Sequence, residues 1–357
     1  MRINTFRSYY IFSALVANIL FFSDATSQSD LSQISEDRKT KTVQIINEIL
    51  PSVAAIQTFK ESGTDGIYNL QVGSASVIHE DGYLLTNEHV VSGMVQGNAI
   101  LYNSQPKQFK VIASMASEDL AIIKINSDEK LKPVPIGRSN DLLLGEPVIT
   151  IGNPGGLNHS ISTGIISGLN RSTSTGSTFL PWMIQTSAAV SGGNSGGPLI
   201  NALGQQIGTI TSKQLGSENI NFAISIDRIR EVLPNLLSPE LRYGFWLGID
   251  IQMLSDEVIV KSIKDNSPAS DSKFITGDVI KSVNGTQISH PFDFYFSLIG
   301  LKQNQKINMT ILREKSPIDL EVTLGELKLI APIETMEATQ GISYKLYEGQ
   351  WDKLPDF

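Results

Sequence analysis

A chain of 357 residues that is 41% hydrophobic is long enough for two or three globular domains, which excludes an intrinsically disordered protein. Its 36 acidic residues outnumber its 28 basic residues, so the composition excludes the basic surface that a nucleic-acid partner would need. It contains no cysteine, so its folded state must be stabilised by apolar cores without disulfide bonds.

Residues 1–27 have the pattern of a secretory signal peptide. Two arginines precede an apolar run over residues 9–22, and small polar residues follow it. This run is shorter than the roughly 20 residues that a membrane-spanning helix needs, so cleavage after Ser27 is favoured over a retained anchor. The protein is therefore expected to be exported, to a periplasm or to the extracellular space. Tethering to a membrane is the alternative if the segment is not cleaved.

Residues 28–47 are expected to form a polar lead-in that ends in a short helix. Pro51 ends this helix because proline has no backbone N–H to continue the helical hydrogen bonds. The chain then changes to short segments rich in β-branched residues and separated by turns. Twelve such segments are predicted as strands, in two groups of six: 52–59, 75–79, 83–86, 98–102, 109–113 and 120–125, then 147–151, 160–169, 182–186, 198–201, 206–211 and 219–226. Six such strands in about 75 residues are typical of a closed antiparallel barrel or a sandwich. The tandem pattern predicts a mainly β, double-barrel domain over residues 48–237, with a working cleft between the halves.

A predicted helix over residues 226–237 ends this domain, and Pro239 closes it. After a short linker, residues 242–328 form a third compact unit. Its predicted strands are 244–249, 258–260, 278–285, 307–312 and 320–324, and its predicted amphipathic helix is 291–301. Residues 329–357 form a tail that is rich in aromatic side chains.

The stretch from Ser191 to Leu199 places four glycines around Ser195. Glycine at this density disfavours a helix or an ordinary strand, so a tight loop is expected. Such a loop can direct backbone N–H groups at one point, where a serine would be placed to attack a carbonyl. A glycine-rich hairpin turn is the alternative, and only a base and a carboxylate elsewhere in the chain would decide between the two.

Two residues of the first barrel can supply these groups. His89 follows the apolar strand over residues 83–86, and Asp119 begins the strand over 120–125. Each alone is typical of a structural residue, since histidine at a strand end and aspartate at a turn are common. Together with Ser195, however, they occur in the order that places base and acid on one barrel and the nucleophile on the other.

With these motifs the sequence resembles the HtrA/Deg family of trypsin-like serine proteases, whose protease domain has the chymotrypsin-like double-barrel fold. The matching stretches are 81–91, 119–125, 151–157, 163–167 and 185–199, and the resemblance covers roughly residues 45–328. It implies that Ser195 is the nucleophile, His89 the general base and then acid, and Asp119 the residue that fixes the histidine tautomer. The oxyanion hole would be formed by the loop of Gly193, Asn194 and Ser195, through the N–H groups of Gly193 and Ser195.

Residues 242–328 resemble a PDZ domain of the kind that follows the protease in this family. Phe245, Trp246, Leu247, Gly248 and Ile249 match its carboxylate-binding loop, and stretches at 267–269, 277–280 and 283–285 match its core signature. The resemblance implies that backbone N–H groups near Leu247 and Gly248 hold the carboxylate of a C-terminal peptide, while the peptide adds a strand beside Ile249. A small β domain used only for packing is the alternative.

The sequence departs from the family at three positions near the predicted site. Ser187 stands where the family has aspartate, Glu88 where it has asparagine, and Gly192 where it has proline. Glycine at 192 gives the loop more unfolded and inactive conformations, which disfavours its ordered state by about 0.4–1 kcal/mol. This suggests a loop that an activator peptide could shift toward a competent state. Phe222 and Ala223 are candidates for the specificity pocket. No metal site and no cofactor are expected, because Asn87-Glu88-His89 lacks the second histidine of a zinc-binding helix.

The leading hypothesis is an exported, ATP-independent serine endopeptidase that cleaves unfolded or damaged proteins. Its partners would be misfolded polypeptides and the C-terminal peptides captured by the PDZ domain, with no nucleic acid. Two alternatives remain open: a membrane-tethered protease that cleaves one regulator, and a peptide-binding chaperone or scaffold with an inactive protease body. The family's usual unit implies a homotrimer or a larger assembly.

Overall fold

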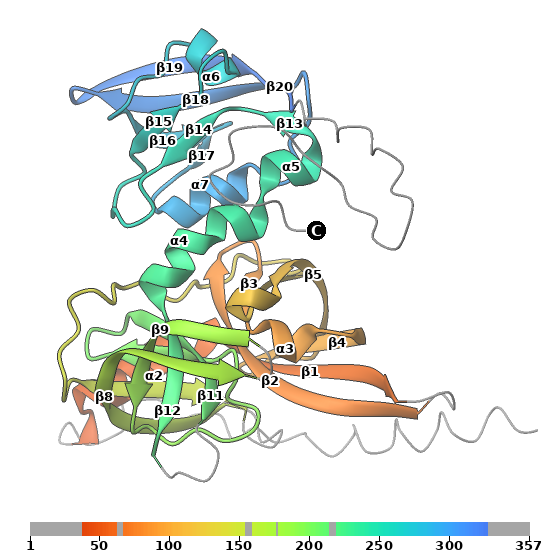
Figure 1. The fold of residues 1–357 in the computed structure, drawn as a ribbon, viewed down its shortest axis with the longest axis vertical. Helices are drawn as coiled ribbons and strands as arrows, with labels where there is room; N and C mark the ends of the chain where they lie inside the picture. Colours follow the sequence, from red (N-terminus) through yellow and green to blue (C-terminus); the bar gives the residue numbers. More distant parts are fainter. Residues whose placement is uncertain (1–37, 63–66, 154–158, 176–177, 214–218, 328–357) are drawn as a thin grey trace, which may run out of the picture. The chain divides into compact units, whose positions relative to one another are not determined.

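A computed structural model describes residues 38–62, 67–153, 159–175, 178–213 and 219–327 (Figure 1). The predicted signal peptide and the tail over 329–357 lie outside these residues. Among the residues described, no helix is both long and apolar enough to cross a membrane. The chain divides into two compact units between Asp227 and Arg228.

The first unit contains two closed six-stranded barrels, which confirms the predicted double-barrel architecture. The strands of the first barrel are β1 (Val53–Ser62), β2 (Ile67–His79), β3 (Tyr83–Thr86), β4 (Met94–Leu101), β5 (Lys107–Met115) and β6 (Leu120–Ile125), paired in the order β1-β2-β3-β6-β5-β4. Antiparallel pairing of β1 with β4 closes the barrel, so no edge strand is left unpaired.

The second barrel repeats this pairing pattern with different residues. Its strands are β7 (Pro147–Gly152), β8 (Ser160–Thr175), β9 (Thr178–Thr186), β10 (Pro198–Asn201), β11 (Gln206–Lys213) and β12 (Asn221–Ser225), paired in the order β10-β11-β12-β9-β8-β7. β10 pairs with β7 to close it. All twelve predicted strands are therefore present, and several extend beyond the predicted bounds.

An apolar cluster fills each barrel because the strands direct their β-branched and leucine side chains inward. In the first barrel Ile56, Val77 and Ile123 are fully buried, and in the second Ile166 and Leu199 are. The predicted short helix is α2 (Lys41–Ile49), followed by the 3₁₀ turn η3 (Leu50–Ser52) that contains Pro51. Two further single turns, α3 (Glu88–Val91) and η4 (Ala116–Glu118), interrupt the first barrel and were not predicted.

Helix α4 (Ile226–Leu237) joins the two units along the chain, and all but its first two residues belong to the second. The sequence predicts this helix as the end of the protease domain over residues 48–237. In the structure the Arg230 side chain is 1% exposed and donates to the carbonyls of Met253 at 2.7 Å and Ser255 at 2.5 Å, both in the second unit.

The second unit is a small mixed α/β domain. Its elements are α5 (Pro239–Tyr243), β13 (Phe245–Trp246), β14 (Ile249–Ile251), β15 (Val260–Ile263), α6 (Pro268–Asp271), β16 (Val279–Val283), β17 (Thr286–Gln287), α7 (Pro291–Ser297), β18 (Lys306–Arg313), β19 (Ser316–Thr323) and β20 (Gly325–Glu326). The predicted strand over 244–249 is two strands, β13 and β14, separated by a turn at Leu247 and Gly248. The predicted helix over 291–301 ends earlier, at Ser297.

Candidate active site and peptide-binding loop

His89 lies on the single turn α3, which begins directly after β3. Val90 and Val91 anchor this turn because both side chains are buried in the first barrel. The backbone carbonyl of His89 accepts hydrogen bonds from Lys60 Nζ at 3.1 Å and from Gln71 Nε2 at 3.3 Å. The imidazole is thus held on a turn fixed from two neighbouring strands, and one third of its surface remains exposed to a substrate.

Asp119 faces His89 from the end of the turn η4. The Nδ1 atom of His89 lies 2.8 Å from Oδ1 and 3.0 Å from Oδ2 of Asp119, and the backbone N–H of His89 donates to Oδ1 at 3.1 Å. The carboxylate is 5% exposed. Since an ionised carboxylate can only accept, Nδ1 carries the proton and Nε2 is left free to accept one, which is the tautomer of a general base.

The backbone of Asp119 has a left-handed conformation, with φ of +52°. Aspartate tolerates this region better than most residues, and the conformation aims the side chain back toward His89. The Nδ2 group of Asn87 donates to the Asp119 carbonyl at 2.9 Å and holds the backbone in place. The predicted pair of base and acid is therefore brought together by local structure on both sides.

Thr211, on β11 of the second barrel, is a further candidate for the site that the sequence did not single out. Its hydroxyl donates to Asp119 Oδ2, and its carbonyl accepts a hydrogen bond of 3.1 Å from the Ser195 hydroxyl. One residue thus contacts both the acid of the first barrel and the serine of the second. Its side chain is 3% exposed, but β11 contains several other polar residues, so nothing in the sequence marks this threonine.

Ser195 lies in the loop between β9 and β10. The loop turns through a hydrogen bond from Asn194 N–H to the Ser191 carbonyl at 3.0 Å and through Gly193, whose φ is +107°. Glycine is needed there because a side chain is strained at this φ. Gly196, at +85°, donates to the Ile210 carbonyl at 2.8 Å, which fixes the loop to β11.

The Gly193 carbonyl is held by two donors from outside the loop. Ser74 Oγ donates to it at 2.7 Å and the Asn153 N–H at 3.3 Å, which together set the plane of the Gly193–Asn194 peptide. The N–H groups of Gly193 and Ser195 have no acceptor within the described part of the chain, so both are available to a developing oxyanion. Asn194 uses its own N–H in the turn and so shapes the loop.

Ser195 is not hydrogen-bonded to His89 within the residues that the structure describes; its hydroxyl is directed at Thr211. Catalytic hydrogen bonds are often loose in the absence of substrate. A rotation about the Cα–Cβ bond of Ser195 would release Thr211 and direct the hydroxyl toward the first barrel. The site therefore holds the base and acid in register and the nucleophile in a resting rotamer.

The predicted carboxylate-binding loop of the second unit connects β13 to β14. Gly248 has φ of +81°, and a Cβ added there would lie 2.3 Å from Ser267 Cβ, so only glycine fits. The N–H groups of Leu247 and Gly248 both donate to one oxygen of the Glu240 side chain, at 2.8 and 2.9 Å. These two N–H groups therefore do bind a carboxylate, and the one that they bind belongs to this chain.

Strand β14 pairs with β15 along one edge, and no strand pairs with its other edge in the described residues. Phe245, Leu247 and Ile249 are buried, which fixes the loop to the domain core. An open strand edge beside a carboxylate-binding turn is the arrangement that strand addition by a peptide requires.

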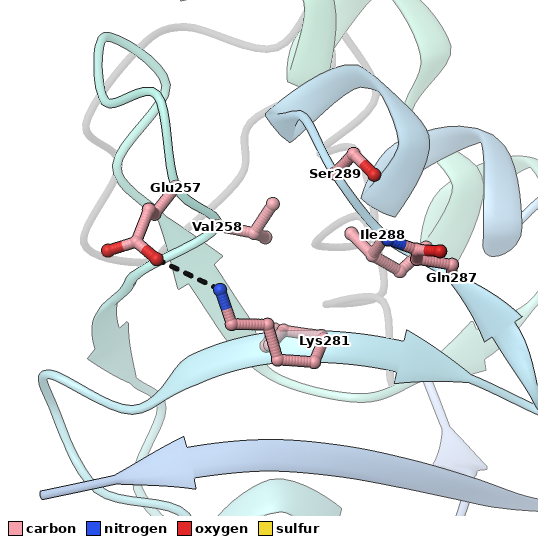
Figure 2. Close-up of a pocket in the computed structure, with 7 residues that line it drawn as sticks. Glu257, Val258, Lys281, Gln287, Ile288 and Ser289 are labelled. Atoms are coloured by element: carbon pink, nitrogen blue, oxygen red, sulfur yellow. Dashed lines mark hydrogen bonds and ion pairs between the residues drawn. The ribbon is translucent and has the colours of Figure 1, made fainter. Parts of the chain in front are cut away.

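A separate hollow of about 450 Å³ lies in the second unit, lined by residues from the segment before β15, from β16, and from the end of β17 and the segment that follows it. Glu257 and Lys281 of this lining form an ion pair of 2.9 Å, which Figure 2 marks with a dashed line. The hollow includes neither the carboxylate-binding loop nor any residue of the predicted triad. Among the residues described, no three potential metal ligands cluster.

Comparison with known proteins agrees with this geometry. Residues 73–208 match the trypsin-like peptidase domain family and residues 246–324 match the PDZ domain family. The chain is 31% identical over 345 residues to a protein named Protease Do-like 1, chloroplastic, from Arabidopsis thaliana; the match spans 87% of this chain and 79% of the relative. The chain belongs to the HtrA/Deg family of trypsin-like serine proteases.

Other relatives of this HtrA/Deg protease point the same way. It is 33% identical over 271 residues to a DegP-like periplasmic serine endoprotease of Pseudomonas savastanoi pv. phaseolicola, in a match that covers 72% of this chain and 56% of the relative. The chain thus spans just over half the length of the DegP-like relatives. Structures of the HtrA-type protease AlgW with a tripeptide and with a decapeptide each match with a TM-score of 0.50, at 28% and 25% identity, over 80% of this chain and 97% and 99% of theirs.

Each departure from the family occupies a defined place in the fold. Ser187 exchanges two hydrogen bonds with Ile165, at 3.0 and 3.1 Å, and so ties the start of the nucleophile loop to β8. A Cβ added at Gly192 would meet no atom within 4 Å. Burial lowers the pKa of Lys60, and the negative charge of Glu88 opposes this shift without cancelling it.

The two candidates for the specificity pocket both lie on β12. Phe222 is 7% exposed, and Ala223 is fully buried in the apolar cluster of the second barrel. The neighbouring Asn221 donates to the Ala188 carbonyl at 2.8 Å, which links β12 to the segment before the nucleophile loop. Their assignment to the specificity pocket stays a prediction.

Proposed function

We propose that this protein is an exported, ATP-independent serine endopeptidase that cleaves unfolded or damaged polypeptides. The observation that carries the proposal is the continuous set of contacts from His89 through Asp119 and Thr211 to Ser195, which joins the two barrels at one point. Export is supported by the signal pattern of residues 1–27 and by relatives that are named periplasmic endoproteases.

In the proposed reaction, Ser195 turns from Thr211 to His89 as substrate enters. The Nε2 atom of His89 takes the hydroxyl proton while the serine oxygen attacks the scissile carbonyl, and the imidazolium that results is stabilised by Asp119. The N–H groups of Gly193 and Ser195 stabilise the oxyanion, and each such donor is worth about 3 kcal/mol in the transition state. His89 then returns its proton to the leaving amine, and water hydrolyses the acyl-enzyme by the same steps.

Incubation of the protein with unfolded casein tests this reaction. Ser195→Ala should reduce the cleavage rate by more than about 10⁴-fold, because no nucleophile remains. Asp119→Asn should lower it by a similar factor, since the amide can donate to Nδ1 and so stabilise the wrong tautomer. Casein that persists equally with the wild-type protein and with Ser195→Ala would sink the protease proposal in favour of a scaffold.

The second unit is proposed to capture the C-terminal ends of polypeptides. The support is the pair of N–H groups at Leu247 and Gly248 beside the open edge of β14. A homotrimer or larger assembly and a cleaved signal segment are further proposals, which rest on the family resemblance and on the length of the apolar run. Light scattering of the purified protein and sequencing of its mature amino terminus test them, and retention of residues 1–27 would favour the membrane-tethered form.

A further inference from the structure

Glu240 places a carboxylate where a peptide's terminal carboxylate is expected to bind. Its Oε1 atom accepts from the N–H groups of Leu247 and Gly248 at 2.8 and 2.9 Å. Hydrogen bonds to an ionised acceptor are the stronger kind, and two of them converge on one oxygen here. No other acceptor contacts these two N–H groups in the described residues.

The supporting structure holds both partners in position. Glu240 lies on the five-residue turn α5, which Pro239 begins and Gly244, with φ of +68°, ends. On the other side of the contact, the Leu247 and Gly248 carbonyls accept from Ala269 and Lys264, at 3.0 and 2.9 Å. The loop's carbonyls are thus engaged within the domain, and its N–H groups face α5.

The surroundings of Glu240 disfavour its charged form. Burial raises the pKa of Glu240, and the two loop N–H groups, which lower it, do not offset the effect. The negative charge of Asp250 raises it further, while the cation of Lys264 lowers it. Tyr295, on α7, is 8% exposed, and burial together with the charges of Asp250 and Glu240 raises its pKa. A partly buried carboxylate held mainly by two exchangeable N–H groups can be replaced by another carboxylate without leaving those donors unpaired.

We propose that Glu240 is an internal competitor for the carboxylate-binding loop, and that a polypeptide chain end binds the PDZ domain only by displacing it. This inference rests on the proposed capture of C-terminal peptides and adds what controls that capture. The ligand class is a chain end with a free α-carboxylate, bound as a strand beside β14. An amidated end, or an internal segment without an acidic side chain, brings no carboxylate and cannot replace Glu240.

Competition lowers the apparent affinity by the fraction of molecules in which the loop is open. Strand pairing with β14 and burial of the ligand's last side chain must therefore supply the net gain, since one carboxylate merely replaces another. The device sets a threshold: short or poorly fitting chain ends are excluded, and extended apolar ends are accepted.

The test is binding to the full chain with Ser195→Ala, which prevents cleavage of the probe. The probe is a fluorescein-labelled pool of decapeptides of random sequence that end in Val, Leu or Phe, prepared as the free acid and as the C-terminal amide. Fluorescence anisotropy is measured for the parent, Glu240→Ala, Glu240→Gln and the control Glu257→Ala, whose carboxylate pairs with Lys281 away from the loop.

Glu240→Ala should bind the free-acid pool roughly tenfold more tightly than the parent, because the loop is then always open. Glu240→Gln should fall between the two, since a neutral amide oxygen competes less well. Glu257→Ala should match the parent, and the amide pool should gain little in any variant. Calorimetry of each variant checks that the second unit is folded. If Glu240→Ala is not folded, the result for Glu240→Gln, which keeps the side-chain shape, decides between the outcomes.

Two negative outcomes are distinct. If folded Glu240→Ala and Glu240→Gln bind the free-acid pool no better than the parent, Glu240 is a structural contact and the inference is overturned, while peptide capture stands. If no variant distinguishes the free-acid pool from the amide pool, the proposed capture of chain ends itself fails.

Discussion

Thr211 is the residue that makes one site out of two barrels. Its hydroxyl donates to Asp119 on the first barrel, and its carbonyl accepts from Ser195 on the second. The hydroxyl is the part that a substitution can remove without disturbing the backbone contact. Its function is therefore testable separately from that of Ser195.

Replacing Thr211 by valine keeps the side-chain volume and removes the hydroxyl. A hydrogen bond to a charged group contributes about 1.5–3 kcal/mol, so we expect kcat/KM on casein to fall by about tenfold or more as Asp119 loses a donor. Thr211→Ser retains the hydroxyl and should stay close to wild type. Equal rates for Thr211→Val and Thr211→Ser would show that the contact with Asp119 does not support catalysis.

At this scale the sequence singled out the residues whose side chains suit the proposed chemistry, and it did not single out the residues that contact them. His89, Asp119 and Ser195 stand out because their types and order match a known chemistry. Thr211 and Glu240 do not, because a threonine in a strand and a glutamate in a turn have many ordinary explanations. Only the fold, which brings Thr211 to Asp119 and Glu240 to Leu247, gives them a function.

Among the elements, strands were predicted better than short helices. Apolar alternation and turn residues mark all twelve barrel strands. The turns α3, α5 and α6 have four or five residues each, which is too short for a helical period to be visible in the sequence. These short turns carry His89, Glu240 and the Ser267 cap, so the missed elements are those that position the sites.

The N-cap of helix α7 is a partly buried histidine whose protonation state is coupled to folding. His290 caps the helix: its Nδ1 accepts from Phe292 N–H at 3.2 Å, and Asp293 accepts from the His290 N–H at 2.9 Å. Burial lowers the pKa of His290 from 6.5 to about 4, helped by the cation of Arg230 and opposed by Asp256. The folded second unit therefore holds this histidine neutral.

Because the folded-state pKa of His290 is the lower one, the unfolded chain binds the extra proton first as the pH falls. The stability from neutral His290 is present above pH 6.5 and is lost as the pH drops toward about 4, by about 3 kcal/mol in total. Calorimetry of the Ser195→Ala chain should show the second unit's transition falling over this range. His290→Asn, which keeps a capping oxygen and cannot titrate, should flatten that dependence. An unchanged pH dependence in this variant would contradict the assignment.

For the whole molecule, the two closed barrels could be predicted from the sequence, but the strand pairs that close them could not. Tandem groups of strands predict two barrels, but the pairs that close them, β1 with β4 and β7 with β10, join segments far apart along the chain. The unit boundary was also hidden. Helix α4 has the pattern of a helix that ends a domain, and only the contacts of Arg230 with Met253 and Ser255 show that it packs with the second unit.

The loop that carries Ser195 departs from the family pattern at Gly192. The family has proline at position 192, where this chain has glycine. A Cβ added at Gly192 would lie in open space, so no steric need for glycine explains the difference. Its effect is instead on the ensemble, since glycine leaves the loop more conformations in which Gly193 and Ser195 do not present their N–H groups together. A ligand that favours the competent conformation would raise the rate without touching the triad.

We therefore expect the free-acid decapeptide pool, at saturation, to raise kcat/KM on fluorogenic casein by about two- to fivefold, which corresponds to 0.4–1 kcal/mol of loop ordering. Gly192→Ala should raise the basal rate by a similar factor and respond less to the pool, because part of the ordering is already present. The amide pool controls for peptides that merely compete as substrates. Identical rates with saturating free-acid and amide pools would show that occupancy of the PDZ domain does not act on the loop. If the free-acid pool raises the rate of Gly192→Ala as much as that of the wild type, the effect does not depend on this glycine.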